Sequence, residues 1–331
     1  MMERIRIIWK KRKKLILMIL ACLFASYFLL VNFLVSAALV PSFMEKLEAF
    51  DRITTESYAM QVHTSDIKTR HKQTRDKTKE WYTEVKRQKM VKESSDGYSL
   101  VAERFIAKKD SHKWVLLLHG YTGWKEEMYP FACWYYERGF HVVVPDLRCQ
   151  GESEGDFIGM GWTDHFDGML WIDYILSQDS SAEIVIHGQS MGAAAALMIA
   201  GADPPENVKM AVSDCAYTDA YSMFGEKIKE WFSLPAFPIV DTARLLLKLR
   251  GGYDLKDASA INAVKKSTVP ILFIHGDQDA MVSVRMAKEL YRAADCEKEL
   301  LIVEGAGHAQ SQDKDPEAYF GAIRTYLDKY T

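Results

Sequence analysis

The stretch "EIVIHGQSMGAAAALMIAG" (residues 183–201) is an apolar run that is interrupted by Gly188, Ser190 and Gly192 and then becomes a string of alanines. Its first part predicts a buried strand, and its second part predicts a closely packed helix. A serine between two glycines at such a junction is typical of a nucleophile elbow, a tight turn that exposes the serine hydroxyl at a sheet edge. The glycines are expected because the two backbones approach too closely for side chains. Ser190 is therefore a candidate nucleophile, and a serine that only caps the helix is the competing interpretation.

Similar apolar runs recur on both sides of this stretch and alternate with amphipathic segments. Further buried strands are expected at 114–120, 140–146, 208–214, 269–277 and 298–305. Helices are expected at 126–138, 164–176, 190–200, 284–294 and 316–329. Upstream, residues 87–107 indicate two strands joined by a turn at Ser95-Asp96-Gly97. This alternation predicts the α/β class, with a mostly parallel central sheet and helices on both faces.

The alternation breaks between Asp214 and Val269, where more than fifty residues rich in bulky apolar side chains intervene. A plain connection of that length is uncommon in a compact domain. We therefore expect a helical cap insertion at about 218–265. Its apolar cluster is either ordinary packing or the wall of an acyl pocket or lid. The members of that cluster are Trp231, Phe232, Leu234 and Phe237.

A nucleophilic serine needs a base, and His308 is the candidate among the nine histidines. It lies in "EGAGHAQSQD", a loop of small residues between the last expected strand and the last helix, from which it can reach the carboxyl edge of the sheet. The base needs a carboxylate that orients it. The segment "HGDQDAMVS" offers two aspartates, of which we expect Asp279 to take this role and Asp277 to order the turn. Asp214, at the end of the preceding strand, is the third choice.

A tetrahedral intermediate needs donors for its oxyanion. The backbone N–H groups of Tyr121, in "HGYTGW" after the strand at 114–118, and of Met191, after the serine, are the expected donors. The side chain of Tyr121 is expected to line the entrance to the site.

The N-terminus differs from the rest of the chain. Seven basic residues lie within residues 1–14, and residues 15–40 carry no charge. Such a run is long enough to span a bilayer, and the basic cluster predicts a cytoplasmic N-terminus with an extracytoplasmic catalytic domain. The alternative is a signal peptide cleaved after Val35-Ser36-Ala37, which would make the protein secreted. Residues 41–84 are expected to form a stalk or linker, and residues 85–331 the catalytic domain.

The composition and motifs argue against several classes of protein. The 331 residues carry a net charge of −3, which gives nucleic-acid binding no electrostatic basis. The five cysteines form no C-x-x-C pair, and no dinucleotide, P-loop or H-E-x-x-H motif is present. We therefore expect no cofactor and no metal. Whether any cysteines pair, and the oligomeric state, stay open.

Residues from about 85 to 330 resemble the α/β-hydrolase superfamily. The similarity rests on "HGYTG", "PDLRCQGES", "GQSMG", "HGDQDAMV" and "GAGH". It points to a bacterial, membrane-anchored esterase/lipase-like branch that is often labelled serine-aminopeptidase-like. The resemblance implies a triad of Ser190, Asp279 and His308, no cofactor, and a cap after the sixth strand. Cys149-Gln150 departs from the small residue and histidine that relatives often carry there.

These patterns together predict a serine hydrolase that cleaves a small acyl-ester or lipid-like substrate through an acyl-enzyme. A serine peptidase or an acyltransferase with the same triad is the alternative. A non-catalytic binding protein on a hydrolase fold is the second alternative, because a fold does not determine a function.

Overall fold

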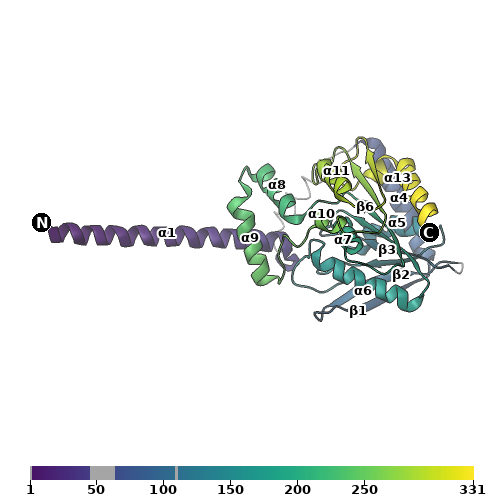
Figure 1. Cartoon of the computed structure of the whole chain (residues 1–331), viewed down its shortest axis with the longest axis horizontal. Helices are drawn as coiled ribbons and strands as arrows, with labels where there is room; N and C mark the ends of the chain where they lie inside the picture. Colours follow the sequence, from purple (N-terminus) through teal and green to yellow (C-terminus); the bar gives the residue numbers. More distant parts are fainter. Residues whose placement is uncertain (1, 45–63, 109–110) are drawn as a thin grey trace.

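The computed structural model describes residues 2–44, 64–108 and 111–331 of the chain. Its centre is a sheet of eight strands in the order β1-β2-β4-β3-β5-β6-β7-β8 (Figure 1). Strand β2 runs antiparallel to both β1 and β4, and all strands from β3 to β8 are parallel. The strands are β1 Arg87–Glu93, β2 Ser99–Phe105, β3 Lys113–Leu118, β4 His141–Pro145, β5 Glu183–Gln189, β6 Val208–Asp214, β7 Ile271–Gly276 and β8 Lys298–Val303. The predicted α/β class with a mostly parallel sheet is confirmed.

Helices cover both faces of the sheet, as predicted. One face packs against α6 Trp162–Gln178, α7 Met191–Ala200, α10 Ala260–Val264 and α11 Val284–Ala293. The other packs against α5 Tyr129–Tyr136, which follows the short 3-10 helix η1 Lys125–Met128, and against α13 Pro316–Tyr330, which follows α12 Ser311–Lys314. Continuous apolar strands suit this arrangement because successive side chains point to opposite faces. In β3, Val115 and Leu117 enter one core while Leu116 enters the other.

The long insertion after β6 forms two consecutive helices, α8 Ala220–Phe232 and α9 Ala236–Arg250. We call this pair the cap hairpin. It lies at the end of the domain from which α1 extends (Figure 1). Lys227 in α8 ties it to the loop after β7, because its ammonium donates to the carbonyl of Ala280 at 2.6 Å. The next helix, α10, packs on α7 and belongs to the main layer.

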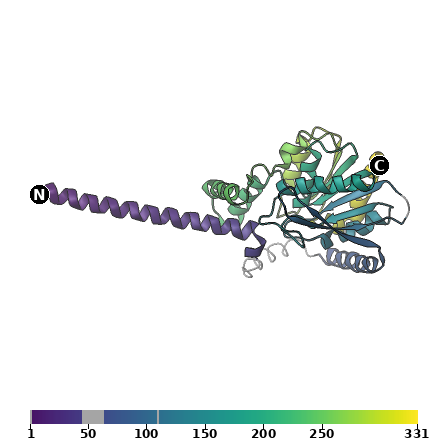
Figure 2. The same ribbon diagram turned by 90° about the horizontal axis from the view of Figure 1, so that it is seen from below.

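The N-terminal helix α1 runs from Met2 to Leu39 and is followed by the short α2 Pro41–Met44. Its segment Trp9–Leu39 is long and apolar enough to cross a membrane. Most of α1 projects away from the domain in both views (Figures 1 and 2), and only its last part touches other elements. Leu39 belongs to the main core, and its carbonyl accepts a hydrogen bond from the Ile158 N–H at 2.9 Å.

Helix α4, Ser65–Glu84, lies in the segment expected to be a stalk. It is packed on the domain: the Trp81 ring lies 4.9 Å from the Phe105 ring, and the imidazole of His71 lies 2.9 Å from the carboxylate of Asp313. This part of the expected stalk is therefore a helix that contacts the domain. The boundaries expected for the N-terminal segment, anchor, stalk and catalytic domain stay predictions, and residues 45–63 of that stalk lie outside the described residues.

Candidate active site

Ser190 lies in a tight turn between β5 and α7, with φ 56° and ψ −116°. This left-handed backbone is uncommon for a residue with a side chain, and such strain is typical of functional turns. The backbone comes too close to both flanking glycines for a side chain to fit. A Cβ on Gly188 would lie 2.1 Å from the Gly192 carbonyl oxygen, and one on Gly192 would lie 2.1 Å from that of Leu118. The turn is held in place because the Ser190 N–H donates to the Asp214 carbonyl at 2.7 Å.

The structure brings together the three residues predicted to form a triad, each from a different strand end. The His308 Nε2 atom lies 2.8 Å from Ser190 Oγ, and its Nδ1 atom lies 2.7 Å from Asp279 Oδ2. His308 follows β8 and Asp279 follows β7, which are neighbours in the sheet. The side chains of His308 and Asp279 are 2% and 0% exposed, so this contact is shielded from water. The imidazole can therefore accept a proton from the hydroxyl while the carboxylate fixes its orientation.

The carboxylate of Asp279 is held in its charged form. Its Oδ1 atom accepts hydrogen bonds from the backbone N–H groups of Met281 at 2.9 Å and Val282 at 2.8 Å. Burial by itself would raise the pKa of this carboxyl. The electrostatic and hydrogen-bonding interactions with His308 and His275 outweigh burial and hold the pKa of Asp279 well below its ordinary value. A negative charge at this position would stabilise an imidazolium on His308.

The two competing aspartates have other partners. Asp277 accepts a hydrogen bond from the Gly305 N–H at 2.7 Å and so ties the loop after β7 to the loop after β8. Asp214 lies beneath the elbow, where its carboxylate accepts hydrogen bonds from Gln189 at 3.0 Å and from the Tyr319 hydroxyl at 3.1 Å. Of the three aspartates weighed from the sequence, Asp279 is the one hydrogen-bonded to His308 in the described structure.

The two expected oxyanion donors belong to segments that lie beside Ser190. Met191 is the first residue of α7, where backbone N–H groups have no acceptor within the helix. Gly120, which precedes Tyr121, lies against the serine, because a Cβ built on it would be 3.4 Å from Ser190 Cβ. The hydroxyl of Tyr121 donates to the carbonyl of Ala38 at the end of α1. This side chain therefore joins the loop beside Ser190 to the N-terminal helix.

The four residues expected to form an acyl pocket or lid lie at the turn of the cap hairpin. Their side chains are exposed, from 43% for Trp231 to 73% for Phe237. The structure does not bury them in a closed wall around Ser190. The complete set is Trp231, Phe232, Leu234 and Phe237.

Two further residues approach the site that the sequence reasoning did not assign to it. His275 ends β7, and its Nε2 atom lies 3.2 Å from Asp279 Oδ2 and 2.8 Å from the Val282 carbonyl. The step "HGDQD" carries both groups four residues apart, which is the signal that could have identified it. The thiol of Cys215 lies within 4.8 Å of ligand atoms of Asp279 and His308. Burial raises the pKa of this thiol well above its ordinary value, and both His308 nitrogens already face partners, so the group does not suit a metal ion.

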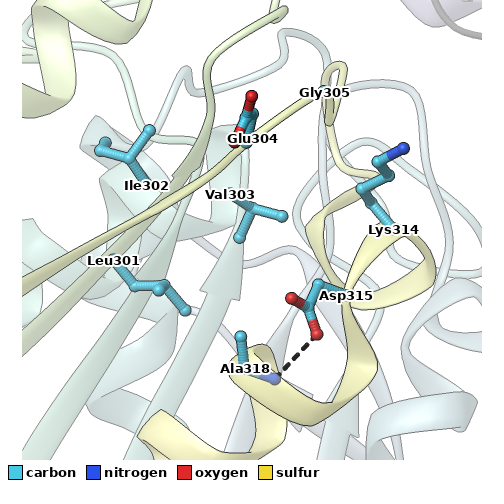
Figure 3. A pocket seen from close by; sticks show the side chains of 8 residues that line it. All are labelled: Leu301, Ile302, Val303, Glu304, Gly305, Lys314, Asp315 and Ala318. Carbon is cyan, nitrogen blue, oxygen red and sulfur yellow. Dashed lines mark hydrogen bonds between the residues drawn. The ribbon is translucent and has the colours of Figure 1, made fainter.

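A hollow of about 570 Å³ lies away from these residues, at the outer edge of the sheet beside β8 (Figure 3). Its opposite wall includes Lys314 and Asp315, whose carboxylate accepts a hydrogen bond from the Ala318 N–H at 3.0 Å. None of Ser190, Asp279 and His308 lines it. Asp315 caps α13 there.

Comparisons with known proteins agree with this architecture. A model of the alpha/beta hydrolase family matches residues 115–322. Protein YqkD of Bacillus subtilis is 26% identical over 250 residues, which cover 75% of this chain and 82% of that protein. The lysophosphatidylserine lipase ABHD12 of Danio rerio is 25% identical over 209 residues, which cover 58% of this chain and 50% of the lipase. The chain therefore matches about half the length of that lipase.

Solved structures share the fold. The Pyrococcus furiosus esterase Pf2001 superposes with a TM-score of 0.60 at 19% identity, covering 74% of this chain and 92% of the esterase. The acylaminoacyl peptidase of Pyrococcus horikoshii superposes with a TM-score of 0.55 at 17% identity, covering 76% of this chain and 42% of the peptidase. At such identities the similarity establishes the fold, and the chemistry has to be argued from the site.

Proposed function

The chain belongs to the alpha/beta hydrolase family, and from that premise we propose that it is a serine hydrolase that cleaves acyl esters through an acyl-enzyme. The single observation that carries the proposal is the buried His308 imidazole, which lies 2.8 Å from the Ser190 hydroxyl and 2.7 Å from the Asp279 carboxylate. Such a chain of contacts activates a serine that is otherwise a poor nucleophile.

In the proposed reaction, Ser190 Oγ attacks the ester carbonyl while His308 Nε2 takes its proton. The imidazolium then gives that proton to the leaving alcohol, and Ser190 keeps the acyl group. A water molecule, deprotonated by the same nitrogen, hydrolyses the acyl-enzyme and restores the serine. The backbone N–H groups of Tyr121 and Met191 stabilise the oxyanion in both steps.

We also propose that α1 is retained as a membrane anchor, with its N-terminus in the cytoplasm and the hydrolase domain outside. Trp9–Leu39 has the length and composition of a span, and the basic residues before Leu15 favour this orientation. The end of the helix supports retention, because Val35, Ala37 and Leu39 are buried against the rest of the protein. A chain cleaved after Ala37 would lose the contacts of Val35. The mass of the mature protein, purified from membranes, tests this part.

The enzymatic proposal is tested with the full chain in detergent. We expect it to hydrolyse p-nitrophenyl acetate and to react with a fluorophosphonate probe at Ser190. Ser190→Ala should lose both reactions, with turnover reduced roughly 10⁴-fold or more. Ser213→Ala is a matched control, because this buried hydroxyl in β6 has no hydrogen-bond partner among the residues that the structure describes. It should keep the parental rate.

The alternatives give different results in the same assay. Faster cleavage of aminoacyl p-nitroanilides than of p-nitrophenyl esters would indicate a peptidase. Transfer of the acyl group to an added alcohol in preference to water would indicate an acyltransferase. A chain that leaves the probe unreacted would indicate a binding protein on a hydrolase fold.

A further inference from the structure

Exposed apolar side chains concentrate on the cap hairpin. Apart from α1, nine large apolar side chains are exposed among the described residues: Val91, Trp124, Phe166 and six that lie between residues 231 and 249. We call those six the cap apolar face. They are Trp231, Phe232, Leu234, Phe237, Leu245 and Leu249. Exposed apolar residues gathered in this way mark an interaction surface.

This face lies beside the N-terminal helix, because α9 packs directly on α1. Val31 and Val35 of α1 are buried against Leu246 of α9. The Tyr27 hydroxyl lies 2.9 Å from Thr242 Oγ1, and the Arg250 guanidinium donates to the Asn32 side chain at 2.9 Å. The contact therefore covers α1 from Tyr27 onward. The position of α1 in a bilayer fixes the depth of α9.

The length of the uncovered part of α1 then places α9 at the membrane. Twelve residues, Leu15–Ser26, separate Tyr27 from Lys14, which is the last basic residue before the uncharged run. At ~1.5 Å per residue they extend ~18 Å, which is ~12 Å short of a hydrocarbon core of ~30 Å. If α9 stayed outside the bilayer, that shortfall would draw the lysines at 10, 11, 13 and 14 into hydrocarbon, which strongly disfavours charged side chains. Tilt of α1 only increases the shortfall. The part of α1 that carries α9 must therefore lie in the outer leaflet.

The cap apolar face points in the required direction. At 100° per residue, Leu245 and Leu249 lie on the side of α9 roughly opposite Val240 and Leu247, which are buried in the main core. They thus face away from the domain. In Figures 1 and 2 the uncovered part of α1 also extends away from the domain, from the end where the cap hairpin lies. The exposed face of the hairpin and the membrane-spanning part of α1 therefore lie on the same side of the domain.

We propose that the cap apolar face is a membrane-docking surface that inserts into the outer leaflet of the bilayer spanned by α1. The inference rests on the anchoring proposed above and is independent of which bond the enzyme cleaves. Its occupant is lipid acyl chain, because the continuity of α1 with α9 brings that side of the hairpin to acyl-chain depth. Two aromatic rings at the hairpin turn, Trp231 and Phe232, suit the interface between acyl chains and headgroups.

The test uses the full chain in vesicles of phosphatidylcholine and phosphatidylglycerol, with nitroxide labels read by electron paramagnetic resonance. A Cys22→Ser, Cys296→Ser background removes the exposed and the half-buried thiol. Leu249→Cys and Phe237→Cys then each place one label on the cap apolar face. Glu304→Cys, on the exposed sheet edge, is the aqueous control. Native Cys22 in a Cys296→Ser chain reports whether α1 spans the bilayer.

Labels at 237 and 249 should collide more with oxygen and less with a water-soluble nickel chelate than the label at 304. The ratio of oxygen collisions to nickel-chelate collisions at these two labels should shift toward the ratio measured at Cys22. If the label at Cys22 has the accessibility expected in hydrocarbon while the labels at 237 and 249 have that expected in water, docking is refuted and the anchor stands. If the label at Cys22 also has the accessibility expected in water, α1 does not span the bilayer and the docking proposal is refuted with it. Labels at 237 and 249 that are shielded from both reagents would show a protein partner, such as a second copy, in place of lipid, and would overturn the proposal.

Discussion

Replacing Asp279 by asparagine exchanges one oxygen for an amide nitrogen and leaves the shape of the side chain unchanged. Two fixed donors decide how the new side chain sits. The Met281 and Val282 N–H groups point at Oδ1 from 2.9 and 2.8 Å, so the amide oxygen must occupy that position. The amide NH₂ group is then forced into the place of Oδ2, 2.7 Å from His308 Nδ1.

That orientation reverses the hydrogen bond to the histidine. An NH₂ group donates, so Nδ1 of His308 must accept, and the single proton of the neutral imidazole moves to Nε2. Nε2 faces Ser190 Oγ at 2.8 Å and can no longer take its proton. A base held in the wrong tautomer loses roughly 10⁴-fold in turnover, about 5 kcal/mol of transition-state stabilisation.

The assay is the turnover of p-nitrophenyl acetate by the full chain in detergent, together with circular dichroism to show that the variant is folded. Asp277→Asn is the matched control, because the amide oxygen of asparagine can still accept the hydrogen bond from the Gly305 N–H. It should retain activity within about tenfold of the parent. Equal losses in the two variants, or a loss below tenfold for Asp279→Asn, would refute the reasoning and direct attention to Asp214.

Three other predictions concern the elbow, a buried carboxyl and the cap. Gly192→Ala puts a Cβ 2.1 Å from the Leu118 carbonyl oxygen and should destabilise the domain by ~3 kcal/mol or more in thermal unfolding. Gly321→Ala in α13, where a Cβ would meet open space, should be neutral or stabilising. Equal unfolding temperatures for the two variants would contradict this prediction. Burial and the charge of Asp167 raise the pKa of Asp164 to about 7. Between about pH 4 and pH 7 the folded state therefore keeps a proton that the unfolded state has lost, and the free energy of unfolding should fall as pH rises through this range. Asp164→Asn should flatten that slope in melting curves, and an unchanged slope would rule this carboxyl out as the cause. Phe237→Ala should slow hydrolysis of long-chain esters in vesicles more than that of acetate in solution, and equal losses would point to simple packing.

The sequence by itself determined the succession of strands and helices along the chain. The spacing of apolar residues indicates which side chains are buried, and glycines mark turns where a side chain would not fit. A tight turn at Gly188 and Gly192 could be proposed because the requirement for small residues there is local: strand and helix backbones meet within five residues. Ser190, His308 and Asp279 could be proposed because each follows an expected strand, and the ends of parallel strands gather at one edge of a sheet.

What the sequence left open depended on side-chain direction and on packing between distant segments. Asp277 and Asp279 are two residues apart in one loop, and only the path of that loop directs one toward Gly305 and the other toward His308. The same loop path brings His275 beside Asp279, although the two residues are only four positions apart in the sequence. Helix α4 has the composition of a solvated spacer, yet Trp81 and His71 dock it on the domain through contacts with residues far along the chain. The contact of α1 with α9 joins residues more than two hundred positions apart, and no local pattern encodes such a pairing, because it arises only when the folded domain brings two apolar helix faces together.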